Sequence, residues 1–215
     1  MKTKIRLMKN NQNKELSQIK DYESWIKEGN EHFKLKEYTA ALICYDSALE
    51  ISSEDSKIWD NRGVALSSLR RFDEAIDSFE ISLELEPDNS KAWSNMGVTL
   101  ASVRRFDEAI NCFNKAIELD PTDVNSIDNK GTALFTISKY DEALECFNES
   151  LSIDPSDAKA WAGKGSVLRF MEKYEEAIES LEKFIELSPP ELANQNQQAW
   201  AMILELKLLL KKKNE

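Results

Sequence analysis

The apolar positions between residues 90 and 123 fall into two stripes, each with the spacing of one helix face. The polar pair Arg104–Arg105 separates the stripes, and acidic residues follow it, as is typical of a helix amino end. Asp120 precedes a proline and therefore avoids the helical region, which ends the second stripe. The pattern predicts a helical hairpin with apolar residues Ala92, Trp93, Met96, Leu100 and Val103 in the first helix and Ala109, Ile110, Phe113, Ala116 and Ile117 in the second.

This pattern recurs every 34 residues along the chain, which is the separation between Gly29 and Gly63. Several independent residue types keep the same period, which indicates a tandem array of hairpins. Asx and Ser residues around 88–90, 122–126 and 156–157 predict side-chain caps for the first helices. The periodic positions are Gly29, Gly63, Gly97, Gly131 and Gly165; Ala41, Ala75, Ala109, Ala143 and Ala177; Trp25, Trp59, Trp93 and Trp161, with Ile127 in the remaining slot; and Pro87, Pro121, Pro155 and Pro189.

These positions resemble the tetratricopeptide repeat, whose motif runs Trp-x2-Leu-Gly-x2-Tyr, then Ala-x3-Phe, then Pro. The resemblance implies an all-α fold: a right-handed α-solenoid of five helix-turn-helix repeats followed by a C-terminal capping helix. We divide the chain into a basic tail, 1–21, the repeat region, 22–191, and the capping helix, 192–215. The five repeats are expected at 22–55, 56–89, 90–123, 124–157 and 158–191.

The periodic glycines suggest close packing within each hairpin. A glycine inside a helix costs about 1 kcal/mol relative to alanine, so five in register need a structural reason. We expect Gly97 of the first helix to face Ala109 of the second, so that the two backbones approach closely. Trp93 and Phe113 would then fill the volume on either side.

The resemblance also implies which residues face the concave side of the solenoid. The ionised residues at these positions sum to +3, whereas residues 21–198 as a whole carry −18. A mildly basic groove within an acidic protein favours partners with acidic or carboxyl-terminal groups. The recurring asparagines are able to donate to and accept from a peptide backbone, although the repeat commonly carries asparagine there. The candidate groove residues are Lys27, Asn30, Lys57, Asn61, Lys91, Asn95, Val98, Asn129, Lys159 and Arg169.

Two alternatives to a general peptide scaffold follow from the sequence. In the first, the chain resembles the chaperone-binding members of the family, which clamp a terminal Glu-Glu-Val-Asp with lysine, asparagine and arginine side chains. Asn30, Asn61 and Lys91 match this clamp, but Ile26 and Asn95 stand where two of its cations are expected. In the second, the chain is an assembly module that acts through its apolar C-terminal helix.

The two ends of the chain differ from the repeats. The segment 1–20 has a net charge of +5, typical of a flexible tail or of a strip that docks on an acidic surface. The C-terminal helix is more apolar than a cap requires. We place Trp200, Ile203 and Leu204 on one face, and Met202, Leu206 and Leu209 on another. This surplus suggests a homodimer, an interfacial membrane contact or a plain cap, with Trp200, Ile203, Leu206 and Leu209 as the surface.

The remaining chemistry argues against other function classes. The chain has 28 Lys and Arg against 39 Asp and Glu, a net charge of −11, which disfavours binding to nucleic acid. Cys44, Cys112 and Cys146 occupy one repeat position without metal-ligand spacing, and we read His32 as a partly buried structural residue. No phosphate loop or catalytic motif is present, so we expect no enzyme, cofactor or metal. No stretch is apolar enough for a transmembrane segment, and we expect a cytoplasmic location.

Overall fold

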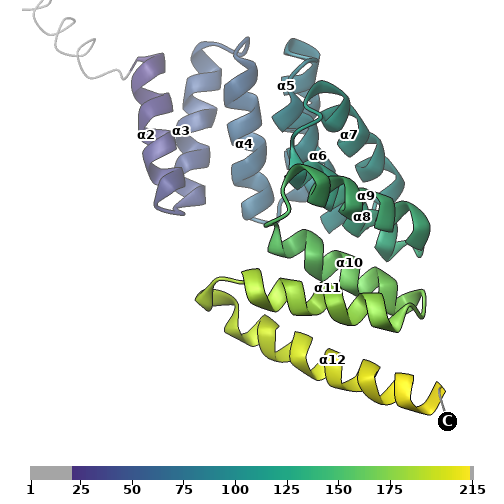
Figure 1. Cartoon of the computed structure of the whole chain (residues 1–215). Coiled ribbons are helices and arrows are strands. Elements are labelled where there is room, and N and C mark those ends of the chain that lie inside the picture. Colours follow the sequence, from purple (N-terminus) through teal and green to yellow (C-terminus); the bar gives the residue numbers. More distant parts are fainter. Residues whose placement is uncertain (1–20, 214–215) are drawn as a thin grey trace, which may run out of the picture. The chain divides into compact units, whose positions relative to one another are not determined.

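The computed structural model describes residues 21–213, and these residues form α-helices, one short 3₁₀ turn and no strand (Figure 1). The predicted basic tail lies outside the described residues, apart from Asp21. The chain divides into two compact units, an N-terminal unit up to Pro87 and a C-terminal unit from Asp88. The all-helical prediction is therefore confirmed for the described part of the chain.

The N-terminal unit consists of two antiparallel helical hairpins, in which the second helix of the first hairpin packs against the first helix of the second. Its core includes Ala41, Tyr45, Ala48, Ile58 and Ala65, all at most 2% exposed. Ala41 and Tyr45 hold the Ala-x3-Phe positions of the repeat motif, so these motif residues belong to the core. The helices are α2 (Tyr22–Lys34), α3 (Tyr38–Ile51), α4 (Ser56–Ser68) and α5 (Phe72–Leu85).

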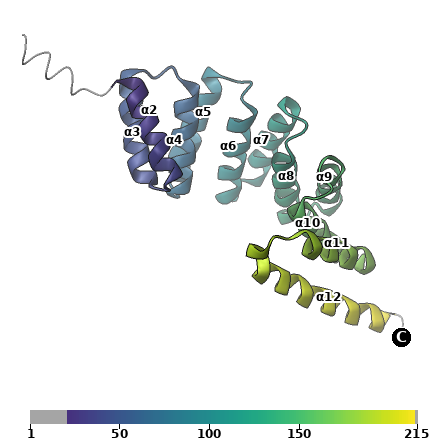
Figure 2. The same cartoon turned by 60° about the vertical axis from the view of Figure 1, so that its left-hand side comes forward.

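The C-terminal unit contains three further hairpins and one longer final helix (Figure 2). Successive hairpins pack second helix against first helix, and α12 packs against α11. The helices are α6 (Ser90–Ser102), α7 (Phe106–Leu119), α8 (Val124–Thr136), α9 (Tyr140–Ile153), α10 (Ala158–Phe170), α11 (Tyr174–Leu187), the 3₁₀ turn η1 (Pro190–Leu192) and α12 (Ala193–Lys213).

Side-chain caps begin each first helix, and those of α6, α8 and α10 lie in the segments where the sequence predicted them. The caps satisfy backbone N–H groups that have no partner within the first turn. In α6, for example, Asn89 accepts a hydrogen bond from the N–H of Ala92 at 3.2 Å. The capping residues are Asp21, Asp55, Asn89, Asp123 and Asp157.

Each hairpin turn contains one residue in the left-handed backbone region, and none of these five is glycine. Between α6 and α7, the N–H of Arg105 donates to the carbonyl of Leu100, and the N–H of Arg104 donates to that of Ala101, both at 3.0 Å. This is a Schellman arrangement, which usually places glycine at the left-handed position. The five residues, with φ between 57° and 65°, are Lys36, Arg70, Arg104, Ser138 and Glu172.

Five of the six helical glycines have a ring as their nearest neighbour, and Gly165 lies against the side chain of Leu181. A Cβ atom on Gly97 would lie 2.6 Å from Cε1 of Phe113, and the three closest atoms all belong to that ring. The prediction that Gly97 faces Ala109 is therefore wrong in its partner, because the aromatic residue four positions further along lies over the glycine. The inference that the glycines serve close packing is confirmed.

The helix α12 has one buried face and one exposed face. Ala199, Ile203 and Leu206 are buried against α11, because residues three and four apart share a helix face. Our placement of Ile203 and Leu206 on different faces is therefore wrong, and neither is available to a second copy of the chain. The exposed stripe consists of Trp200, Leu204 and Leu208, at 50%, 62% and 63% exposure, while Leu209 is partly buried. Within residues 21–213, no helix has both the length and the hydrophobicity needed to cross a bilayer.

Candidate functional site

Two of the predicted groove residues of the N-terminal unit, Lys27 and Asn30, line a polar hollow of about 410 Å³ on α2. Lysine and glutamate side chains occur there in equal number, so the hollow has no net charge. This hollow therefore lacks the net positive charge that the sequence predicted for the groove. Its lining residues are Glu23, Ile26, Lys27, Asn30, Glu31 and Lys34.

Two of the candidate asparagines bind each other within this unit. The Oδ1 atom of Asn30 accepts a hydrogen bond from the hydroxyl of Tyr45 at 2.9 Å and one from Nδ2 of Asn61 at 3.4 Å. Tyr45 is 1% exposed and belongs to the core. The amides of Asn30 and Asn61 therefore link two neighbouring first helices to the core, which is a structural role.

The C-terminal unit has a hollow of about 280 Å³ formed by α6, α7 and α8. Of the predicted groove residues, Val98 and Asn129 line it. Val98 is 43% exposed, so its apolar side chain is open to contact at this surface. The full lining is Val98, Ala101, Ser102, Phe106, Phe113, Asn129, Thr132, Ala133 and Thr136.

A second hollow of about 360 Å³ lies where α10, α11 and α12 meet. Lys159, a predicted groove residue, lies on its rim with the polar side chains of Ser166, Gln195 and Gln198. The floor is apolar, and part of it comes from α12. This hollow combines an apolar floor with a few polar groups, the usual composition of a ligand-binding pocket. Its apolar lining is Ala162, Leu181, Phe184, Leu192, Ala199 and Met202.

Two of the ionised residues behind the predicted groove charge of +3 are Arg169 and Asp128, and neither faces a ligand freely. Arg169 pairs with Glu205 of α12, with Nη2 lying 3.3 Å from both carboxylate oxygens. Asp128 is only 7% exposed, and its Oδ1 atom has no hydrogen-bond partner within the described residues. Burial raises the pKa of Asp128 to about 7; the hydroxyl of Ser150 opposes this rise, and the carboxylate of Asp157 adds to it. The ion pair cancels one positive charge of the predicted groove and protonation of Asp128 cancels one negative charge, so the two effects offset each other in the predicted sum of +3.

The other three candidate residues lie on the first helices. Lys57 is exposed on α4 of the N-terminal unit, and Lys91 is exposed on α6 of the C-terminal unit. The backbone carbonyl of Asn95, on α6, accepts a hydrogen bond from Thr99 at 2.9 Å. None of the three lines any of the four hollows described in this section.

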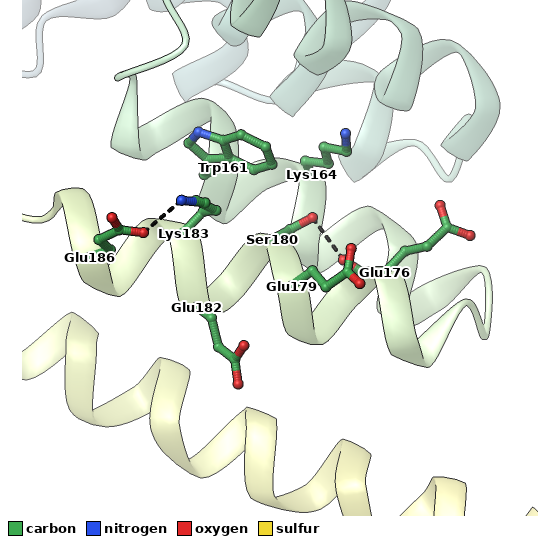
Figure 3. A pocket seen from close by; sticks show the side chains of 8 residues that line it. All are labelled: Trp161, Lys164, Glu176, Glu179, Ser180, Glu182, Lys183 and Glu186. Atoms are coloured by element: carbon green, nitrogen blue, oxygen red, sulfur yellow. Dashed lines mark hydrogen bonds and ion pairs between the residues drawn. The ribbon is translucent and has the colours of Figure 1, made fainter.

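A larger hollow of about 460 Å³ is acidic and differs from the predicted groove (Figure 3). Within it, Lys183 pairs with Glu186 at 2.7 Å, and the Ser180 hydroxyl donates to the carbonyl of Glu176. Four glutamates face two lysines, so this surface disfavours the acidic ligand predicted for the groove. The lining residues are Trp161, Lys164, Glu176, Glu179, Ser180, Glu182, Lys183 and Glu186.

Sequence reasoning missed the contribution of α12 to the site. Gln195, Gln198 and Met202 line the apolar hollow, and Glu205 neutralises Arg169. The repeat pattern ends before these residues, so it gives no register for them. The one available signal was the polar run Asn194–Gln198, which precedes the apolar segment of the same helix. This change in polarity indicates that the helix begins with exposed polar side chains and continues with a buried apolar stripe.

Sequence models of the tetratricopeptide repeat match residues 22–55, 56–89, 90–123, 129–157 and 158–191. No match was found among curated protein sequences. Among solved structures, YrrB, described as a tetratricopeptide-repeat protein with an unusual peptide-binding site, is 26% identical. The match covers 87% of this chain and 92% of YrrB, with a TM-score of 0.68.

Structures of MamA are also similar to the chain. Residues 41 to the end of MamA from Desulfovibrio magneticus RS-1 are 18% identical, and the match covers 77% of this chain and 94% of that one with a TM-score of 0.72. A further MamA structure is 17% identical, covers 77% and 91%, and has a TM-score of 0.70. At these identities the likeness concerns the fold alone, which is that of an α-solenoid.

Proposed function

The chain belongs to the tetratricopeptide repeat family, and on that premise we propose that it is an interaction scaffold whose C-terminal unit binds a peptide segment of a partner protein. The apolar hollow between α10, α11 and α12 receives one bulky apolar side chain of that peptide. Lys159 on the rim pairs with a nearby carboxylate, either an acidic side chain or the carboxyl terminus. The amides of Gln195 and Gln198 bind the peptide backbone.

The observation that carries this proposal is the composition of the hollow. Its floor contains Leu181, Phe184 and Met202, and its volume of about 360 Å³ is sufficient for a large side chain. Burying one such side chain contributes about 1.5–3 kcal/mol, whereas an exposed pair with Lys159 contributes about 0.2–1 kcal/mol. Affinity therefore comes mainly from the apolar anchor, and the charge determines orientation. The description of YrrB as a peptide-binding member of the family supports the same class of ligand.

The test is selection of short peptides from a synthetic random pool on the full-length chain, followed by affinity measurement with a labelled selected peptide. We expect Ala162→Leu, which fills the hollow, to weaken binding by about tenfold or more. We expect Lys159→Gln to weaken it by about two- to fivefold and to reduce its dependence on salt.

The matched control is Lys183→Gln, which removes the same charge from the acidic hollow. This variant should bind the selected peptide as the wild type does. Unchanged affinity in Ala162→Leu, with an unchanged melting temperature, would refute the proposal. A peptide that loses affinity equally in both lysine variants would show that only overall charge matters.

Self-association through α12 is a second candidate function, favoured by the exposed stripe Trp200, Leu204 and Leu208. Apolar residues at successive helical turns form a continuous patch, and such patches often mark interfaces. We expect the mass of the wild type, measured by light scattering, to rise with concentration. The double variant Leu204→Glu and Leu208→Glu should remain monomeric, and a monomeric wild type at all concentrations would contradict this function.

A further inference from the structure

The first helix of the first repeat differs from the other first helices at several positions, two of which carry metal-binding side chains. At one of them it carries His32, whereas the other four repeats carry a core leucine that is at most 1% exposed, namely Leu66, Leu100, Leu134 or Leu168. One helical turn earlier, the same helix carries Glu28. Both departures introduce side chains that bind metal ions, and they lie on the same helix face.

The hairpin brings a third metal-binding side chain to this pair. Cys44 of α3 is 3% exposed, and its Cβ lies 3.1 Å from the position of a Cβ on Gly29, so it faces α2. The ligand atoms of Glu28, His32 and Cys44 all lie within 4.8 Å of one another. The sequence alone does not indicate this cluster, because His32 and Cys44 belong to different helices and come together only when the hairpin folds.

A fourth residue orients the histidine. Nε2 of His32 lies 3.9 Å from Oε1 of Glu28, while Nδ1 lies 2.6 Å from Oε2 of Glu37. A histidine that binds a metal through one nitrogen usually donates its other N–H to a carboxylate, which fixes the ring and its tautomer. Glu37 therefore occupies the place of such an outer carboxylate.

We propose that Glu28, His32 and Cys44 form a binding site for a divalent transition-metal ion of the zinc class. Thiolate, imidazole and carboxylate are the donors that zinc takes, and a tetrahedral ion with bonds of about 2.0–2.3 Å places its ligands about 3.3–3.8 Å apart. The ligand atoms lie at most 4.8 Å apart, so binding requires a contraction of about 1 Å or more where a pair is at that limit, and the side chains of Glu28 and His32 are both only partly buried. Water completes the coordination as the fourth ligand.

Binding couples to protonation and to the stability of the hairpin. The Cys44 thiol releases its proton to solvent as the metal–sulfur bond forms, so that affinity falls as the pH falls. The ion connects α2 to α3, and it therefore stabilises the first hairpin in proportion to its occupancy. Cys112 and Cys146 hold the equivalent position in later repeats, but the residues that correspond to His32 there are Leu100 and Leu134.

The experiment is a Co²⁺ titration of the full, metal-free chain under reducing conditions, followed by absorption. We expect one equivalent to bind with a thiolate-to-cobalt charge-transfer band in the near ultraviolet, and Zn²⁺ to displace it. His32→Leu and Cys44→Ser install residues that other repeats already carry at those positions, so both variants should fold. Each should lose the band and the rise in melting temperature that Zn²⁺ gives the wild type.

Cys112→Ser is the matched control and should retain both properties. Glu37→Gln should weaken binding by about 10- to 100-fold, as expected for an outer carboxylate. A wild type without a thiolate band, or a band that survives in Cys44→Ser, would overturn the proposal. So would a band that disappears in Cys112→Ser, because the metal would then be bound elsewhere.

Discussion

Replacing Asp128 by asparagine should stabilise the C-terminal unit above neutral pH. The carboxyl group lies on α8, buried against α9 and α10, and faces Ser150, Asp157 and Lys159. Its pKa rises from 3.8 to about 7, mainly through burial. Between these two values the folded chain holds a proton that the unfolded chain has released, so stability falls as the pH rises towards 7.

The size of the effect follows from the same numbers. A rise from 3.8 to about 7 is about three pKa units. At about 1.36 kcal/mol per unit, the upper bound is about 4 kcal/mol. Asparagine is neutral at every pH, keeps the shape of the side chain and can donate to the Asp157 carboxylate. Because the Asp128 carboxylate retains some contact with Ser150 and Lys159, we expect a gain of about 1–3 kcal/mol at about pH 8 and little change at about pH 4.

The assay is urea denaturation of the full chain at several pH values between about 4 and 8, followed by circular dichroism. The wild type should lose stability across this range relative to Asp128→Asn. The control Asp77→Asn changes an exposed residue of α5 and should leave the pH dependence unaltered. If wild type and Asp128→Asn show the same pH dependence, the buried carboxyl does not titrate near 7 and the reasoning fails.

Three further predictions concern the repeat itself, each read out as the free energy of unfolding. A Cβ on Gly97 would lie 2.6 Å from the ring of Phe113, whereas a Cβ on Gly131 would lie 3.1 Å from its closest neighbouring atom. Gly97→Ala should therefore reduce the free energy of unfolding by about 1–2 kcal/mol more than Gly131→Ala does. Equal losses in the two variants would contradict the packing argument. Ser138 has φ 64°, so Ser138→Gly should stabilise by about 0.5–1 kcal/mol; a loss of stability would show that the hydroxyl matters more. Asn89→Ala removes the cap of α6 and should cost about 1 kcal/mol, and a neutral result would mean that water replaces the cap.

The hairpins were predictable because each repeat position has one structural task. Gly97 lies under a ring, Ala109 is buried, and Asn89 caps α6. The equivalent positions of the other repeats have similar tasks, so similar residue types recur there. Periodicity of this kind fixes the helices and the core without any knowledge of long-range contacts. The partner of Gly97 was mistaken because spacing shows that a position is small, not which side chain covers it.

The candidate site was less predictable because its properties depend on pairs of residues far apart in sequence. Arg169 carries the charge expected of a groove residue, but Glu205 of α12 neutralises it at 3.3 Å. Asn30 has the expected amide, but Tyr45 and Asn61 already bind its oxygen. A residue's position in the repeat predicts which way it faces, whereas its partner decides whether it is free to bind a ligand.

Departures from the repeat are therefore better guides to function than its regular positions. A regular position is explained by the hairpin, so its residue needs no further cause. His32 replaces a leucine that is buried in every other repeat, and it does so beside a glutamate and a buried cysteine. Asp128 places a carboxyl group where burial opposes its charge. We expect leucine at position 32 and asparagine at position 128 to be more stabilising, and residues that depart from the repeat at such a cost are candidates for binding a ligand or a proton.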